Sequence, residues 1–239
     1  MLELLRSDIF FKDELDHPAS GYAKWFQRIH TMRLCASYHD RKNFCEVGAN
    51  DYLEILKQFP GDKYIIDPYD GLEGMGAAIL PPDIPDRCEV FRCALGVDSG
   101  DIPGDLFDYV ITVSVIKHIG QSETNFDCEP LDYRPKEQEE PRDAFCNELF
   151  RVMRPGGVTI HSIDHAPHNR SYLKNFTDAG FELLRNDELP SVDECLHDLS
   201  AVRQRHDWLD PAIPMPVEEM RLHSVLTMGF VKPQTERPA

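Results

Sequence analysis

The stretch 44-FCEVGANDYLEILKQFPGDKYIIDPYDG-71 decides the fold class. It begins with an apolar run that ends at Gly48, continues with a helical pattern over 51–59, and closes with a second apolar run that ends at Asp67. A proline and a glycine at 60–61 are a stop signal between the helix and the second run. The order of strand, helix and strand indicates an α/β unit.

Gly48 and Asp67 are the two residues of this stretch that point to a ligand. A glycine lets the backbone turn tightly and approach a bound molecule closely. Asp67 follows Gly48 by roughly 20 residues, the spacing at which a carboxylate ending the second strand binds the two hydroxyls of a ribose. The pair therefore predicts a nucleoside-containing cofactor. A tight turn without a ligand is the alternative interpretation of this stretch alone.

The residues around Gly48 indicate which cofactor. A dinucleotide-binding turn carries three glycines, whereas this turn has one and continues with Asp51 and Tyr52. Glu46, two residues before the glycine, disfavours a doubly negative pyrophosphate because like charges repel. It favours a cationic amino-acid end, such as the ammonium and sulfonium groups of S-adenosylmethionine.

Strands and helices alternate along most of the chain. Apolar runs predict strands at 43–47, 63–67, 88–95, 107–113, 158–163, 181–185 and 223–231. Helical patterns are found at 22–39, 51–59, 143–153 and 171–179, and another follows the capping box at 191–194. This alternation predicts an open, mostly parallel sheet whose ligands bind beyond the carboxyl ends of its strands.

The chain divides into three parts. We expect an N-terminal helical segment (1–42), a main domain (43–232) and a tail (233–239). Two insertions interrupt the main domain, at 121–142 and 187–220. The first is polar, acidic and too long for a plain connection, so it is either a lid over the substrate or a solvated loop.

The charge and the composition exclude several classes of partner. The 239-residue chain has a formal net charge of −17, which repels phosphate backbones and anionic membranes, so we expect no nucleic acid partner. No apolar run reaches the roughly 20 residues that span a bilayer, and the N-terminus lacks the features of a signal peptide. The seven cysteines form no CxxC pair, which favours reduced thiols in a cytoplasmic protein.

Three motifs resemble those of class I S-adenosylmethionine-dependent methyltransferases. The segment 107-FDYVITVSVIKHI-119 resembles their fourth-strand motif, and 148-ELFRVMRPGG-157 resembles the motif before their fifth strand. The segment 46-EVGAN-50 matches their first motif, and Asp67 stands at their ribose-binding acid. The resemblance extends over residues 43–185. It implies a Rossmann-like α/β enzyme with a seven-stranded, mostly parallel sheet, an antiparallel last strand, helices on both faces and S-adenosylmethionine as cofactor.

The resemblance also implies which residues bind the cofactor. They are Glu46, Gly48, Ala49, Asn50, Asp67, Pro68, Ala94, Leu95, Ser114 and Val115. Two positions depart from the family pattern, because Tyr52 replaces a small residue and Lys117 replaces the common glutamate. The segment 93–96 has no acid where many members carry one near the adenine. Backbone amides and apolar contacts are then expected to hold the adenine, with Asp98 as the alternative.

Transfer of a methyl group to a hydroxyl is helped by a base that removes the acceptor's proton. His165 is our first candidate for this base, and His118 and Asp164 are the others. A surface role is the alternative for His165, and a bond to the backbone at a helix start is the alternative for His118. His161 lies inside a strand and is interpreted as a core residue or as a residue that contacts the site residues from behind without touching the substrate. Asp164, His165 and His168 are also ligand types that suit a divalent cation, but their close spacing identifies no metal site.

The acceptor is predicted from a looser resemblance. The segments 161-HSIDH-165 and 172-YLKNFTDAGF-181 look like parts of methyltransferases of polysaccharide and glycolipid biosynthesis. We therefore expect O-methylation of a small molecule such as a sugar, a sugar nucleotide or another polyhydroxylated acceptor. The alternatives are a non-sugar natural product as acceptor, or a non-catalytic binding protein, which Tyr52 and Lys117 favour. Apolar residues at 208–216 either stack on the sugar, form a homodimer contact or pack in the core.

Overall fold

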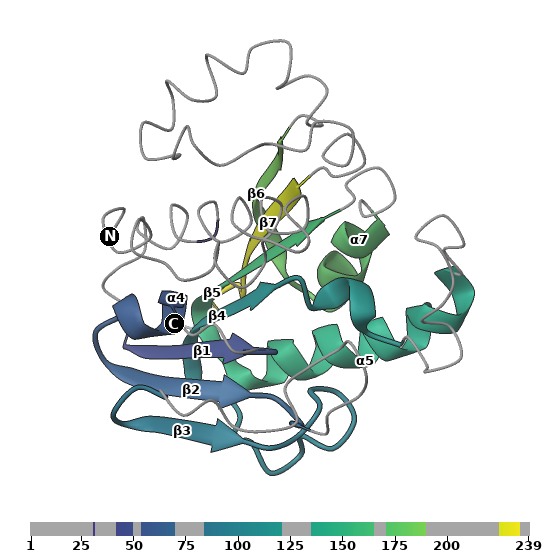
Figure 1. The fold of residues 1–239 in the computed structure, drawn as a ribbon. Helices are drawn as coiled ribbons and strands as arrows, with labels where there is room; N and C mark the ends of the chain where they lie inside the picture. Colours follow the sequence, from purple (N-terminus) through teal and green to yellow (C-terminus); the bar gives the residue numbers. More distant parts are fainter. Residues whose placement is uncertain are drawn as a thin grey trace, which may run out of the picture.

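The computed structural model of the protein describes residues 31, 42–49, 54–69, 84–120, 135–164, 171–189 and 225–234. Its strands are β1 (Asn43–Val47), β2 (Asp62–Ile66), β3 (Cys88–Phe91), β4 (Phe107–Val113), β5 (Met153–Asp164), β6 (Glu182–Leu189) and β7 (Val225–Val231). Its helices are α4 (Glu54–Gln58), the short 3₁₀ helix η1 (Ile116–His118), α5 (Pro135–Val152) and α7 (Ser171–Asp178), as Figure 1 shows.

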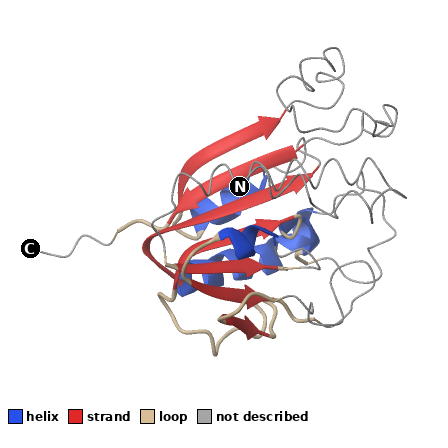
Figure 2. Ribbon diagram, turned by 60° about the vertical axis from the view of Figure 1, so that its left-hand side comes forward, coloured by secondary structure: helices blue, strands red, loops and turns tan. Residues whose placement is uncertain are grey.

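The strands form one seven-stranded sheet in the order β3-β2-β1-β4-β5-β7-β6. The pairs from β3 to β5 are parallel, and β7 runs antiparallel to both β5 and β6. Figure 2 shows these strands as one continuous twisted sheet. The chain moves outward from β1 to β3 and then returns to β4 on the other side of β1, so the strand order switches between β1 and β4. Ligands of open α/β sheets bind at such a switch point.

The central strands are buried on both faces, as parallel strands usually are. Every residue of β1 is buried, and so are most residues of β4. Because side chains alternate along a strand, Phe44 and Tyr109 face one core, whereas Cys45 and Val110 face the other. The expectation of an α/β sheet with helices on both faces is therefore confirmed.

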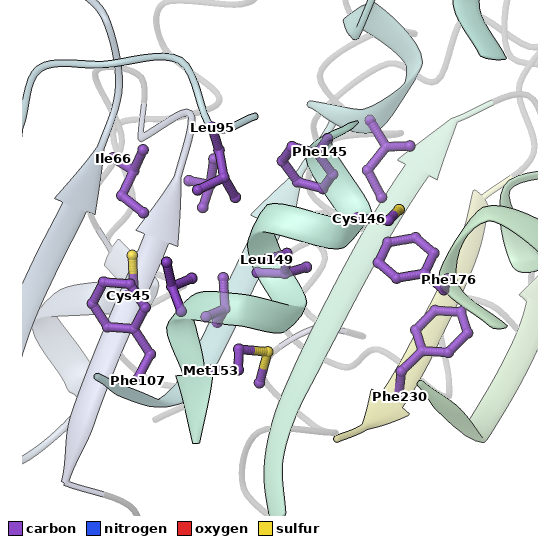
Figure 3. Close-up of a cluster of buried hydrophobic side chains, with 14 of the residues drawn as sticks. Cys45, Ile66, Leu95, Phe107, Phe145, Cys146, Leu149, Met153, Phe176 and Phe230 are labelled. Carbon is purple, nitrogen blue, oxygen red and sulfur yellow. The ribbon is translucent and has the colours of Figure 1, made fainter. Parts of the chain in front are cut away.

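The two faces are covered by different helices. Ile55 and Leu56 of α4 pack into the core that contains Phe44. Leu149 of α5 and Phe176 of α7 pack into the opposite core, which Figure 3 shows in close-up. Leu149 has no exposed surface, so replacing it with alanine would cost about 2–5 kcal/mol of stability.

One boundary of the predicted elements was wrong by several residues. The helix expected at 143–153 begins at Pro135, so the last part of the insertion expected at 121–142 is the first two turns of α5. Pro141 lies inside this helix and removes only one backbone hydrogen bond. The helix continues across the proline because the turns that follow bury Phe145, Cys146 and Leu149 in the core.

Three strands also differ in length from the predictions. β3 ends at Phe91 instead of residue 95, because the amide of Cys93 turns back to donate to the Phe91 carbonyl. β5 begins at Met153 instead of residue 158, and its register with β4 jumps over 154–157. β6 continues to Leu189 instead of residue 185, because the polar segment after Arg185 pairs with β7.

Lys232, just after β7, forms hydrogen bonds that join several segments at the amino edge of the sheet. Its ammonium donates to the carbonyls of Phe150 and Met153, at 2.9 and 2.7 Å, and to the Asp105 carboxylate at 2.8 Å. The Lys232 amide also donates to the Gly157 carbonyl of β5, so the end of β7 is tied to β5 as well as to the last turn of α5. These bonds place a nearly buried charge where three acceptors satisfy it.

Some predictions lie outside the described residues. Of the helix expected at 22–39, the structure describes only Thr31, which is helical and buried. The helix after 191–194 and the apolar residues at 208–216, with their proposed homodimer contact, are not among the described residues. Within the described part of the chain, no helix is both long and apolar enough to cross a membrane.

Candidate cofactor site at the carboxyl edge of the sheet

The ends of β1, β2 and β4 meet at one edge of the sheet. Val47 pairs with Ile66 of β2 on one side and with Thr112 of β4 on the other. The next residues, Gly48 and Asp67, therefore leave the sheet side by side at the switch point. The Gly48 amide donates to the Ile66 carbonyl at 2.9 Å, which continues the ladder between the two strands.

Gly48 is required by the backbone and by its surroundings. Its φ of +69° lies in the left-handed region, which residues with a side chain rarely adopt. A Cβ at this position would lie 2.4 Å from Cγ2 of Val115, which follows β4. The turn after β1 is thus packed directly against the turn after β4, and the expected tight turn at Gly48 is present.

Two acidic side chains are buried at this edge of the sheet. Glu46 in β1 and Asp67 after β2 are only 4% and 5% exposed. The Oδ1 atom of Asp67 accepts the backbone N–H of Tyr69 at 2.8 Å. The Asp67 amide donates to the Phe91 carbonyl of β3 at 3.1 Å, so its backbone is held from the neighbouring strand. Asp67 is therefore a fixed hydrogen-bond acceptor at the place expected for a ribose-binding acid.

Tyr69 joins the turns after β1 and β2, and the sequence analysis did not identify it. Its hydroxyl donates to the Ala49 carbonyl at 3.2 Å, and the Arg92 guanidinium lies 5.9 Å from its ring centre. Burial, with the nearby Asp67 charge, raises the pKa of Tyr69 well above its ordinary value. Tyr69 therefore stays protonated and remains a donor. Its partner Ala49 is distant in sequence, so no local pattern could have revealed this contact.

The loop after β3 forms its own hydrogen-bond network. The Ala94 amide donates to the Asp98 carboxylate at 2.6 Å, and the Gly96 amide donates to the Ser99 hydroxyl at 3.0 Å. The Ser99 hydroxyl in turn donates to Glu148 of α5 at 2.9 Å. Asp98, the alternative acid for adenine, is thus engaged with the backbone of its own loop.

The same loop is anchored to α5 and to the core. The hydrogen bonds from Arg151 hold the pKa of Glu148 below its usual range, so this carboxylate stays ionised. The side chain of Leu95 is buried and packs into the core with Ile66 and Phe145, as Figure 3 shows. Of the expected cofactor residues in this loop, Leu95 therefore presents backbone rather than side chain to the edge.

The turn after β4 contains a strained residue. Ser114 has a φ of +64°, a conformation that costs a non-glycine residue about 1–3 kcal/mol and is found mainly at functional sites. Its amide donates to the Ser162 carbonyl of β5 at 2.7 Å. Val115 then caps η1, and the His118 amide donates to the Val115 carbonyl at 2.8 Å. The left-handed backbone at Ser114 directs the chain so that the next residue, Val115, packs against Gly48.

Comparison with solved structures reveals the same architecture in other proteins. N-methyltransferase NodS from Bradyrhizobium japonicum, in complex with S-adenosyl-L-homocysteine, matches with a TM-score of 0.55 and 11% identity over 98% of this chain and 97% of its own. The StiE O-MT matches with a TM-score of 0.52 and 16% identity over 92% and 79%. A putative sarcosine dimethylglycine methyltransferase from Galdieria sulphuraria matches with a TM-score of 0.52 and 12% identity over 87% and 85%.

The chain has the class I methyltransferase fold. No protein-family model matches its sequence, and no curated protein matches it. At identities this low, the comparison with solved structures concerns the fold.

Of the three candidate bases, the structure describes the positions of His118 and Asp164 but not that of His165. His118 ends η1 at the carboxyl edge and is partly exposed. Asp164 is the last residue of β5 at the same edge, and its side chain is not among the described features. His165, His168 and Asn50 lie outside the described residues. Among the described side chains, no group of three His, Cys, Asp or Glu residues is arranged to hold a metal ion.

His161 belongs to the core of the methyltransferase fold. It has no exposed surface, and its ring lies between the hydroxyls of Thr112 and Thr159, each 2.8 Å from a ring nitrogen. Thr159 donates its proton to the Val110 carbonyl, so it accepts from Nε2–H, and Nδ1 accepts from Thr112. Burial lowers the pKa of His161 to about 3. His161 is therefore neutral near pH 7, as expected of a core residue.

Proposed function

We propose that the protein is an S-adenosylmethionine-dependent methyltransferase. The observation that carries this proposal is that Gly48 and the buried Asp67 lie side by side at the switch point of a class I methyltransferase fold. Asp67 would accept hydrogen bonds from the ribose hydroxyls, and Gly48 would let the amino-acid end of the cofactor pass close to the backbone. The complex of NodS with S-adenosyl-L-homocysteine supports this choice of cofactor.

The charge of the site supports S-adenosylmethionine over a dinucleotide. Glu46 is buried in β1, two residues before Gly48, and the turn has no further glycines for a pyrophosphate. A negative side chain there attracts the ammonium and sulfonium groups and repels phosphates. The remaining expected contacts are Ala49, Asn50, Pro68, Ala94, Leu95, Ser114 and Val115.

S-adenosylmethionine supplies an activated methyl group and its own leaving group, so the chain has to align the acceptor and accept its proton. We propose an oxygen of a sugar or of another small polyhydroxylated compound as the acceptor. This rests on the sequence likeness at 161–165 and 172–181. Such a hydroxyl needs a base, for which His118, His165 and Asp164 are the candidates. The position of His118, three residues after Val115, supports its candidacy.

Calorimetric titration of the purified protein with S-adenosylhomocysteine tests the cofactor, with NAD as the control ligand. We expect micromolar binding of the first ligand and none of the second. Protein that is folded and binds neither ligand would contradict the proposal and favour a non-catalytic role.

A screen of sugar nucleotides and polyhydroxylated acceptors, with methyl-labelled cofactor, then tests the acceptor. Label transfer to one of them, and its loss in a His118→Ala or His165→Ala variant, is the expected result. Transfer only to an amine or to a non-sugar natural product would overturn the acceptor class and leave the cofactor proposal standing.

A further inference from the structure

We infer that Tyr69 is a positioning residue of the cofactor site, which holds the Asp67 carboxylate and the Ala49 carbonyl in the arrangement that the cofactor needs. This inference rests on the proposed function. It concerns a residue of the opening stretch to which the sequence alone assigned no role.

Tyr69 reaches both halves of the proposed site. Its backbone N–H donates to Oδ1 of Asp67 at 2.8 Å, and its hydroxyl donates to the Ala49 carbonyl at 3.2 Å. Asp67 belongs to the proposed ribose contact, whereas Ala49 belongs to the turn that would face the amino-acid end. One residue, through its backbone N–H and its hydroxyl, thus contacts two groups that would bind opposite ends of the cofactor.

The backbone of Tyr69 is held in an unfavourable conformation. Its φ is +49°, in the left-handed region that aromatic residues rarely adopt. Such strain persists only where the surrounding contacts outweigh it, and it is concentrated at functional sites. Here the conformation turns the N–H of Tyr69 toward Asp67 while its ring remains packed with Ala49 and Ile65 in the core.

The ring gives this connection its rigidity. Tyr69 is 5% exposed, and the Arg92 guanidinium at the end of β3 lies 5.9 Å from its ring centre. A tyrosine has only two side-chain torsions, so a buried ring that is bonded at its tip leaves its own backbone little freedom. Loss of the hydroxyl bond would therefore loosen Asp67 as well as Ala49.

A purely structural role for Tyr69 makes a different prediction. If the ring only fills the core, loss of its hydroxyl changes the stability of the protein. Any change in ligand affinity is then the same whether or not the Asp67 carboxylate is present. If Tyr69 acts through Asp67, the loss of affinity depends on an intact Asp67 carboxylate. A double-mutant cycle separates the two roles.

The experiment measures S-adenosylhomocysteine binding by calorimetry for the wild type, Tyr69→Phe, Asp67→Asn and the double variant. We expect Tyr69→Phe to weaken binding about 3- to 10-fold, the range for one lost hydrogen bond, and less than about 2-fold when Asp67→Asn is already present. Tyr64→Phe, which removes a hydroxyl from β2 itself, is the matched control and should bind like the wild type.

The outcomes separate this inference from the proposed function. If the wild type binds and Tyr69→Phe binds equally well, the positioning role is overturned and the proposed cofactor stands. An equal loss in both Asp67 backgrounds would mean that Tyr69 acts without Asp67, through Ala49 alone, and it would overturn the inference that Tyr69 positions the Asp67 carboxylate. A wild type that binds no S-adenosylhomocysteine would overturn the proposed function and the inference together.

Discussion

A methyl group added at Gly48 would lie 2.4 Å from Cγ2 of Val115, well inside contact distance. This relationship joins the turn after β1 to the turn after β4, the two strands between which the strand order switches. Gly48 is therefore needed even before a ligand is considered.

Gly48→Ala should lower the free energy of unfolding by about 2–5 kcal/mol, from left-handed backbone strain and from overlap with Val115. Urea unfolding measures this change. Adding Val115→Ala removes the overlap but not the strain, so the double variant should be more stable, by about 1–3 kcal/mol, than the sum of the two single changes. Simple additivity would show that the overlap is not the cause. Gly100→Ala, with no atom within 4 Å of the added Cβ, is the neutral control.

Asp67→Ala should weaken S-adenosylhomocysteine binding by roughly 1–3 kcal/mol, because a charge-assisted hydrogen-bond partner is lost. Asp67→Asn keeps an oxygen for the Tyr69 N–H and removes only the charge, so it should weaken binding with less effect on stability. Calorimetry on both variants measures the effect. Asp62→Ala, an exposed change at the other end of β2, is the control. Unchanged affinity in a folded Asp67→Ala variant would remove Asp67 from the ribose role.

His161 should make the protein less stable in mild acid. Its pKa is lowered to about 3 in the folded state, against about 6.5 in an unfolded chain, so the unfolded state binds more protons between these values. The stability that neutral His161 contributes is complete above pH 6.5. It is lost as pH falls, by at most about 1.4 kcal/mol per pH unit.

Urea unfolding at pH 7 and pH 5 tests this prediction on the wild type and on His161→Gln. The wild type should lose more stability between the two pH values than the variant, because the variant lacks this titrating group. Equal losses in the two proteins would mean that His161 takes up a proton without unfolding.

Lys232→Met should lower the free energy of unfolding by about 1.5–3 kcal/mol, because the Phe150 and Met153 carbonyls lose a charged donor. The affinity for S-adenosylhomocysteine should not change, since Lys232 lies at the amino edge of the sheet. Lys174→Met breaks an exposed pair with Asp178 on α7 and should cost less than about 1 kcal/mol. Equal costs for the two lysines would contradict the anchoring role of Lys232.

The fold could be predicted because its signals are local. The apolar runs at 43–47 and 107–113 predict β1 and β4 with the same first and last residues that the structure gives them. Gly48 and Asp67 indicate where β1 and β2 end. The start of α5 was missed because Pro141 is a stop signal in most contexts but not in this one. The full length of β6 was missed because its polar residues are held by pairing with β7, which no local pattern reveals.

The site could be predicted only in part. The neighbouring positions of Gly48 and Asp67 could be predicted, because each residue ends a strand recognisable from the sequence; their roles toward a cofactor stay a prediction. Tyr69 was missed because its hydrogen bond to Ala49 and its left-handed backbone are not encoded by the residues next to it in the chain. The loop network from Ala94 to Glu148 was missed for the same reason, since it joins segments far apart in the chain.

A crystal structure of the protein with S-adenosylhomocysteine would show directly whether Asp67 and Gly48 contact the cofactor. We predict that the ribose hydroxyls lie within hydrogen-bond distance of the Asp67 carboxylate and that the amino-acid end lies against the backbone at Gly48. A ligand bound elsewhere, or bound at this edge with its ribose turned away from Asp67, would contradict the account.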